Sequence, residues 1–209
     1  MQPGLLPLFP LQVVLLPGAE LPLHIFEDRY KEMITEVIRD RHEFGVVLAN
    51  EKGIVNTGCT ATIDKVLRQF PDGRMDILAH GRRRFEIMLL NDERAFLRGS
   101  VEFFDDDGED ATTPDLRRRV IDSFNELQAL SSSQPLEESV EVSQLSFRVA
   151  QSVPDLTFRQ LLLSTRSETD RMKQLAEFLP SYLVRQRRIV HVRDVAPRNG
   201  HGRTPGGVP

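Results

Sequence analysis

The sequence predicts an α+β protein in which a β-rich half comes first and a helical half follows. Between residues 44 and 104, segments of strand composition are separated by glycines and by one Pro-Asp-Gly turn. An acidic stretch then lacks large apolar side chains, and after it the apolar residues recur at helical spacing. We therefore expect four parts: a β-rich part over 1–104, an acidic linker over 105–113, a helical part over 114–190 and a disordered basic tail over 191–209.

The chain opens with a proline-rich apolar stretch, Leu5 to Tyr30. Its four prolines are Pro7, Pro10, Pro17 and Pro22. Proline fixes φ and lacks an N–H, so we expect short extended pieces joined by turns, and neither a central strand nor a continuous helix.

A helix is predicted from Glu27 to Arg41, because its apolar residues fall on one stripe: Tyr30, Met33, Ile34, Val37 and Ile38. Strands are predicted at residues 45–50, 58–70, 75–80, 82–90 and 96–104, with Gly81 as an interruption between the third and fourth. Pro71–Arg74 has the composition of a tight turn, which makes the strands on either side of it a hairpin.

The helical half begins at Thr113-Pro114, an N-cap residue followed by a proline at the first helical position. A second helix is expected over 140–153. Thr157 with Gln160 and Ser167 with Asp170 form capping patterns before two further apolar stripes. Pro180 lies within the last stripe and should kink that helix or end it early.

The sequence offers little for catalysis. It has no phosphate-binding P-loop, no HExxH or GxSxG motif and no paired-cysteine zinc spacing. Cys59 is the single cysteine and is interpreted as a small packed residue. His24 and Glu27 have a spacing that could serve one metal, with His80 as a third ligand, but ordinary histidines are the favoured interpretation. We expect no catalytic residues, no metal and no cofactor.

Three consecutive arginines, Arg82 to Arg84, form the densest charge cluster of the β-rich half. On a strand Arg82 and Arg84 would share one face and could contact nucleic acid. Alternatively, one of the three reaches inward to a carboxylate such as Glu27 or Asp28, and this interpretation is favoured because the surrounding charge is negative. From residue 185 onward six arginines meet one aspartate, so the tail is a second candidate contact for nucleic acid.

The apolar opening is itself a candidate site, since extended backbone can pair with a guest strand and nearby side chains can receive its side chains. The candidates for polypeptide binding there are Leu8, Phe9, Leu11 and Val13. The opposite interpretation, in which most of them form core, stays open at this stage.

Four segments resemble the N-terminal, substrate-recruiting domain family of the ATP-dependent Lon proteases. They read LLPLFPLQVVLLPGAELPLHIFEDRY, FGVVLANEKGIVNTGCTATIDKV, PDGRMDILAHGRRRFEI and VPDLTFRQLLLSTRSETDRMKQLAEFL. In order and spacing they span residues 5 to 183.

The resemblance implies a β-rich pseudobarrel similar to the PUA-like fold, followed by a helical bundle. It implies a non-catalytic module that binds unfolded or degron-bearing polypeptides, that self-associates, and that works with a protease or chaperone ATPase. Glu27, Asp28 and Arg29 match the charged start of the family's first helix and are further candidates for polypeptide contact. We expect a stand-alone module without ATPase or protease domains, in a reducing cytoplasm and away from membranes, since no leader peptide or long apolar run is present.

Overall fold

The computed structural model describes residues 4–108, 112–130 and 144–195. The chain divides into two compact units: residues 1–110 with 144–168, and residues 111–143 with 169–209.

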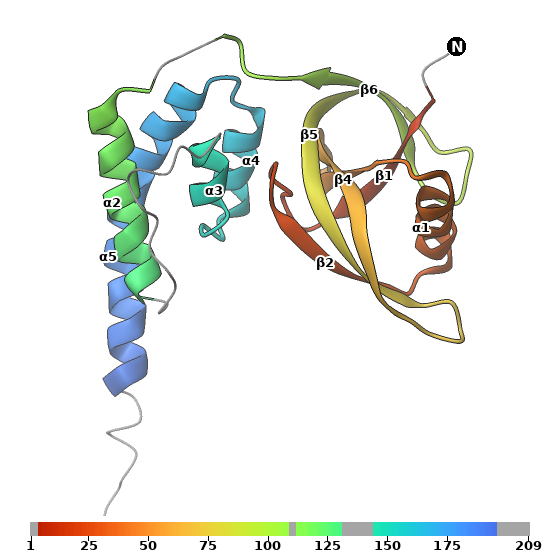
Figure 1. The fold of residues 1–209 in the computed structure, drawn as a ribbon, viewed down its shortest axis with the longest axis horizontal. Coiled ribbons are helices and arrows are strands. Elements are labelled where there is room, and N and C mark those ends of the chain that lie inside the picture. Colours follow the sequence, from red (N-terminus) through yellow and green to blue (C-terminus); the bar gives the residue numbers. More distant parts are fainter. Residues whose placement is uncertain (1–3, 109–111, 131–143, 196–209) are drawn as a thin grey trace, which may run out of the picture. The chain divides into compact units, whose positions relative to one another are not determined.

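The first unit contains a six-stranded sheet that closes on itself (Figure 1). Its strands are β1 (Leu6–Leu11), β2 (Glu20–Ile25), β3 (Phe44–Asn50), β4 (Gly53–Gln69), β5 (Met75–Asn91) and β6 (Arg98–Phe104). Their order is β2-β5-β4-β3-β1-β6, and an additional β5–β6 pairing closes the ring. This mixed sheet with helices is the α+β pseudobarrel that the sequence predicts.

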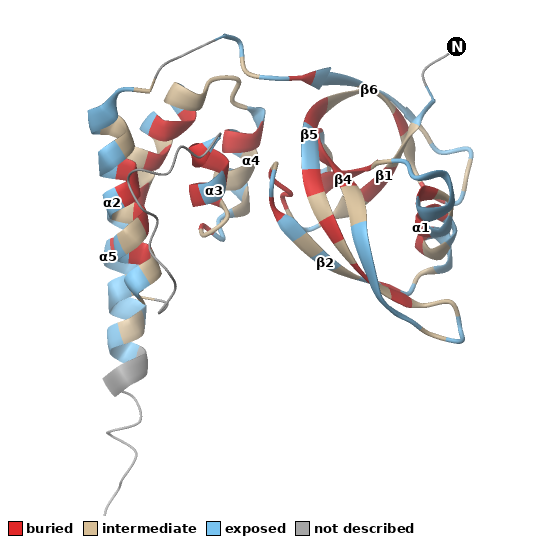
Figure 2. Ribbon diagram, viewed as in Figure 1, coloured by how far each residue is buried: buried red, intermediate tan, exposed pale blue. Residues whose placement is uncertain are grey.

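Closure depends on β5, a strand of 17 residues that changes partner along its length. Its first part, from Met75 to His80, pairs with β2, and its second part, from Arg84 to Asn91, pairs with β6. Burial alternates along the first part, as expected for a strand with one face on the core (Figure 2). β2 pairs only with β5 among the described strands, so Pro22 lies on an edge strand, where proline is tolerated.

The expectation that the proline-rich opening holds no central strand is wrong, because β1 lies between β3 and β6. The Leu8 N–H donates to the Leu97 carbonyl on the β6 side, at 2.8 Å. Backbone nitrogens of a strand point alternately to its two sides, so the Pro7 nitrogen points toward β3. The ladder with β3 starts one residue later, at Leu8. Pro10 faces the other side, beyond the two residues of β1 that pair with β6. Both prolines therefore sit where the ladder needs no donor.

The barrel interior is packed around Phe85, which is fully buried with Leu8 and Val47. Leu6, Ile54, Ile87, Leu97 and Val101 pack against this cluster. Gly45 and Gly58 lie beside the Phe85 ring: a Cβ on either would come within 2.6 Å of its Cζ. The two glycines therefore provide the space that the ring occupies.

Helix α1 (Asp28–Asp40) confirms the predicted helix after the prolines. It buries Tyr30, Met33, Ile34 and Val37. The Tyr30 ring lies 4.1 Å from that of Phe9, so the helix packs on β1, and Phe9 in turn lies 6.4 Å from Phe44 of β3. Since Leu8 contacts the barrel core and Phe9 contacts α1, both faces of β1 are covered.

Two short helices, α3 (Leu145–Ala150) and α4 (Leu156–Ser164), belong to the unit that contains the barrel. The helix expected over 140–153 is thus shorter as observed, and residues 140–143 lie outside the described part. The capping pattern at Thr157 and Gln160 does not form. Asp155 caps α4 instead, accepting from the Phe158 N–H at 2.9 Å, while Gln160 donates to the Thr57 carbonyl of β4 at 3.0 Å.

The second unit contains α2 (Pro114–Leu130) and α5 (Glu168–Val195). α2 starts at the proline, as predicted, with Thr113 accepting from the Leu116 N–H at 3.4 Å. A cluster of Leu127, Tyr182 and Leu183 joins the two helices. α5 continues through Pro180 to Val195, so neither the early end nor a disordered start at residue 191 is observed; residues 196–209 lie outside the described part. Within the described residues, no helix is both long and apolar enough to cross a membrane.

The grouping of the chain thus differs from the expected division at residues 104–114. The segment 144–168 joins the barrel and not α2, because the Gln160 side chain donates to β4 and the Thr165 carbonyl accepts from Arg84 of β5. These contacts join residues about 80 to 100 positions apart, so local sequence patterns do not predict them.

Candidate functional site

The apolar residues of the chain opening that were candidates for polypeptide binding differ in how far they are buried. Leu8 and Phe9 are 0% and 5% exposed and form core, for the reason given above. Leu11 and Val13 are half-buried. The β1 segment therefore offers little open apolar surface, and a binding surface has to be sought elsewhere on the barrel.

Glu27, Asp28 and Arg29 lie at the start of α1 and pair locally. Arg29 donates to the Glu27 carboxylate at 2.9 Å, and Lys31 donates to Asp28 at 3.0 Å. Glu27 is the N-cap residue but its side chain makes no capping hydrogen bond. Their charges are exposed and locally balanced.

Arg84 is buried and has a structural role. Its guanidinium forms an ion pair with Asp106 at 2.6 Å and donates to the Thr165 carbonyl at 2.7 Å. One arginine of the cluster does reach inward, as favoured, but its acid is Asp106 and not Glu27 or Asp28. An arginine with 3% exposure in this setting cannot contact a phosphate backbone, so the proposed nucleic-acid contact at Arg84 is not supported.

Arg82 and Arg84 also fail to share a face, because β5 is irregular between them. The register shifts between Cys59 and Ala61 of β4, where one extra residue of β5 is accommodated, and the Arg83 N–H donates to the Thr60 hydroxyl at 3.1 Å. A bulge of this kind breaks the two-residue alternation. As a result Arg82 and Arg83 are both exposed, and Arg83 lies over the Phe103 ring at 3.9 Å.

Cys59 is fully buried, as interpreted from the sequence, and burial raises the pKa of its thiol to about 12. A thiol in that state is a packing group and a poor nucleophile. The Nδ1 atom of His24 lies 2.6 Å from a carboxylate oxygen of Asp76. No cluster of three metal-ligating side chains occurs in the described ranges 4–108, 112–130 and 144–195.

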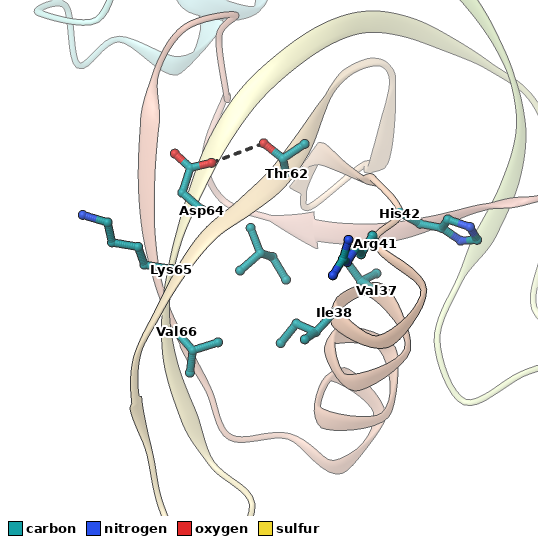
Figure 3. A pocket seen from close by; sticks show the side chains of 9 residues that line it. Val37, Ile38, Arg41, His42, Thr62, Asp64, Lys65 and Val66 are labelled. Atoms are coloured by element: carbon teal, nitrogen blue, oxygen red, sulfur yellow. Dashed lines mark hydrogen bonds between the residues drawn. The ribbon is translucent and has the colours of Figure 1, made fainter.

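A groove lies between the C-terminal half of α1 and β4 (Figure 3). Its central part has a volume of about 430 Å³. The lining residues are Val37, Ile38, Arg41, His42, Thr62, Ile63, Asp64, Lys65 and Val66. Ile38 from the helix and Val66 from the strand are 39% and 45% exposed, which is unusual for aliphatic side chains on neighbouring elements.

The groove continues in both directions past this centre. A hollow of about 290 Å³ shares Ile38 and Val66 and adds Thr35, Arg39, Gln69 and Met75. Another of about 430 Å³ shares Arg41 and His42 and adds Gly4, Leu5, Leu6, Pro7, Glu43, Arg83 and Phe103. We call the three hollows together the α1–β4 groove. It has an apolar floor and a charged rim.

Arg41 holds a strained position at the rim. It is the C-cap residue of α1 in the left-handed conformation, with φ 54°, where glycine is the usual residue.

One backbone feature of the groove is specific to β4. The ladder between β3 and β4 ends at the pair Phe44–Ala61, whereas β4 continues to pair with β5 as far as Gln69. Over residues 62–69, therefore, no described strand pairs with the side of β4 away from β5. This open edge belongs to the same residues that line the groove.

Comparison with known proteins identifies the family. Residues 5–183 match the family described as the ATP-dependent protease La (LON) substrate-binding domain. The chain belongs to this family. Recognition of a substrate is thus the role of the family, and the LON substrate-binding domain is a non-catalytic one.

Curated relatives of this LON domain are Lon proteases. That of Parabacteroides distasonis is 31% identical over 116 residues, covering 51% of this chain and 14% of the relative. That of Cytophaga hutchinsonii is 24% identical over 186 residues, covering 84% of this chain and 22% of the relative. The chain thus spans less than a quarter of the length of these relatives.

Solved structures agree with the fold. The Lon N-terminal domain protein from Xanthomonas campestris matches with a TM-score of 0.68 and 26% identity, covering 84% of this chain and 98% of that one. The N-terminal domain of the Lon protease from the Mycobacterium avium complex matches with a TM-score of 0.61 and 16% identity, over 85% of this chain and 98% of that one.

Sequence reasoning did not find the groove. Ile38 belongs to the predicted core stripe of α1, and Val66 belongs to a strand pattern, in which an apolar residue is ordinarily expected to face the core. The available signal was the run Val66-Leu67 beside Arg68, since two neighbouring strand residues cannot both face one core. Val66 and Leu67 are in fact both exposed, at 45% and 58%.

Proposed function

We propose that the α1–β4 groove binds extended segments of unfolded or degron-bearing polypeptides, and that the chain thereby recruits them to an ATP-dependent protease or chaperone. The observation that carries this proposal is the apolar floor that runs beside the open edge of β4. The family supplies the general role of substrate recognition.

The groove suits an extended guest for two reasons. Backbone groups on an open edge can pair with the backbone of any sequence, which gives affinity without strict sequence demands. Exposed aliphatic side chains such as Ile38 and Val66 can cover apolar side chains of the guest. Unfolded chains expose both kinds of group, and folded proteins bury them.

The charged rim adds a second layer of selection. Arg41 and Lys65 bring positive charge to the groove, and Asp64 brings negative charge. Rim charges of this type alter association rate and partner choice more than affinity. A guest with mixed charges around an apolar centre is the best match.

Delivery to a partner is the second half of the proposal. The proteins that the chain matches are Lon proteases, of which the matched region is 14% and 22% in the two cases above. In this proposal an ATP-dependent protease or chaperone performs unfolding and cleavage, and this chain performs recognition.

The test is binding of a fluorescently labelled, permanently unfolded polypeptide, followed by anisotropy. Val66→Asp and Ile38→Asp place a charge on the floor from two separate elements and should each weaken binding by roughly tenfold or more, since burying such a side chain contributes about 1.5–3 kcal/mol. Leu89→Asp is the matched control, an aliphatic residue of β5 that is 72% exposed and lies outside the groove. It should bind as the unaltered protein does.

Each outcome is informative. Equal weakening by all three variants would show that general surface hydrophobicity and not the groove takes the guest. Binding that resists salt supports apolar recognition, whereas RNA binding that falls steeply with salt while unfolded polypeptide fails to bind would replace the proposal with nucleic-acid recognition.

A further inference from the structure

A second pocket, of about 520 Å³, lies where the helices α3 and α4 meet the barrel within the first unit. Its lining residues are Gly18, Ala19, Glu20, His80, Arg148, Gln151 and Arg159. None of them lines the α1–β4 groove. Whatever this pocket binds is therefore separate from the guest of the groove.

The pocket contains two guanidinium groups without acidic partners in the part of the chain that the structure describes. Neither Arg148 nor Arg159 forms an ion pair with a carboxylate of the described residues, in contrast to Arg84 and Arg94. The Nε atom of Arg159 is also buried and lacks a hydrogen-bond partner. A buried donor without an acceptor costs free energy, and in native proteins such a donor usually meets a ligand or a water.

The surroundings of Arg159 add to this cost. Burial lowers the pKa of its guanidinium. Burying a charge without a partner is strongly unfavourable. An anion in the pocket would remove both penalties at once.

Negative groups nearby limit the net charge of the pocket but do not cancel it. Glu20 is in the lining and opposes an anion. Asp64 faces His80, at 3.9 Å from its Nδ1, and Asp155 is engaged as the N-cap of α4. The lining therefore holds two unpaired arginines and a histidine against one carboxylate.

We propose that this pocket binds an oxyanion, a carboxylate or phosphate group, held by the guanidinium groups of Arg148 and Arg159. The planar donors of arginine match two oxygens of either group, and the free Nε–H of Arg159 supplies a further donor. The group can belong to the C-terminus of a peptide or to free phosphate. Both share the same recognition chemistry, and the experiment separates them.

Binding is measured by titration calorimetry with three probes: inorganic phosphate, a short polar peptide with a free C-terminal carboxylate, and its C-terminally amidated twin. The unaltered protein should bind phosphate or the free-acid peptide with one site per chain. Preference for the free acid over its amide identifies the carboxylate as the source, and binding of phosphate alone identifies phosphate.

Arg159→Gln and Arg148→Gln should each weaken binding by about tenfold or more, the value of one charge-assisted hydrogen bond. Arg148 is exposed, so its variant keeps the test valid if Arg159→Gln fails to fold. Arg82→Gln is the matched control, an exposed arginine outside the pocket, and should bind as before. Glu20→Gln should tighten binding, because it removes the opposing charge.

Two results would overturn the proposal. One is that no probe binds at millimolar concentration. The other is that both arginine variants retain full affinity. Failure of Val66→Asp to affect polypeptide binding bears only on the groove, so the two proposals fail independently.

Discussion

At the scale of single residues, the Phe85 ring depends on two positions that have no side chain. A Cβ at Gly58 would lie 2.6 Å from Phe85 Cζ and 2.7 Å from the Val46 carbonyl oxygen. The carbonyl belongs to the backbone of β3 and cannot swing away as a side chain can. The constraint at Gly58 is thus close approach of neighbouring groups and not backbone conformation.

Gly58→Ala should therefore destabilise the protein by about 1–3 kcal/mol, the usual cost of overpacking a core. The measurement is the free energy of unfolding in urea. Gly4→Ala is the control, because a Cβ at Gly4 meets nothing within 4 Å, and it should leave the unfolding midpoint unchanged. Identical unfolding midpoints for the two variants would contradict the close approach of Gly58 to the Phe85 ring.

At the scale of elements, α1 is tied to the loop before β6 by one arginine. Arg94 donates to the Glu36 carboxylate at 2.9 Å and also contacts Glu32, one helical turn earlier. Its guanidinium lies over the Phe96 ring at 4.7 Å. The hydrogen bond from Arg94 holds the pKa of Glu36 below its ordinary value.

This shift makes stability depend on acid pH. Because the pKa of Glu36 is lower in the folded than in the unfolded protein, its contribution is present above the unfolded value and is lost as pH falls through the folded value. Glu36→Gln should lower the free energy of unfolding at pH 7 and reduce the further loss below about pH 4.5.

Urea unfolding at pH 7 and at pH 3.5 measures this effect. Glu51→Gln serves as control, since Glu51 is exposed and forms no ion pair with a described residue. It should follow the pH dependence of the unaltered protein. If the free energy of unfolding falls by the same amount between pH 7 and pH 3.5 in Glu36→Gln and in the unaltered protein, Glu36 does not contribute to the pH dependence.

Most elements could be predicted from the sequence, because their signals are local. The stripe of α1, the turn at Pro71–Arg74 and the start of α2 at Pro114 each involve a few neighbouring residues. β1 could not be predicted, since the tolerance for its prolines depends on where the two neighbouring ladders begin and end. The same holds for the bulge near Arg83, which depends on the register of β4 against β5.

The site was harder to predict than the fold for a related reason. A pattern of apolar residues shows that side chains are suited to burial, and it does not show which of them the fold leaves uncovered. Leu8 and Ile38 are equally apolar, yet the first is core and the second is 39% exposed in the groove. The difference arises because the ladder of β3 stops at Phe44 and leaves the end of β4 without a neighbour on that side.

At the scale of the whole molecule, Arg84 joins three segments that are distant in sequence. It comes from β5, its carboxylate partner Asp106 follows β6, and its acceptor Thr165 follows α4. Next to it, Arg166 donates to Glu86 of β5 at 3.1 Å. The attachment of residues 144–168 to the barrel thus depends in part on one buried guanidinium.

Arg84→Leu should cost about 3–5 kcal/mol, because it removes one partner of a buried ion pair. Unfolding in urea measures the loss, and hydrogen exchange should show α4 exchanging faster. The neighbouring exposed residue provides the comparison: Arg82→Leu should change stability by no more than about 0.5 kcal/mol. Similar losses in the free energy of unfolding for the two variants would show that Arg84 has no special structural role.

The open edge of β4 also bears on which chains are admitted. Unpaired edges invite strands from other molecules, and natural sheets guard them with charges and irregular register. The open part of β4 has both: Asp64, Lys65 and Arg68 lie along it, and its register with β5 shifts there between Ile63 and Lys65 and again between Val66 and Arg68. The straight edge strand of a folded neighbour, or of a second copy, cannot follow such a bent line over many residues. A loose chain can adjust to it residue by residue, so under the proposed function the irregular register favours guests that have lost their fold.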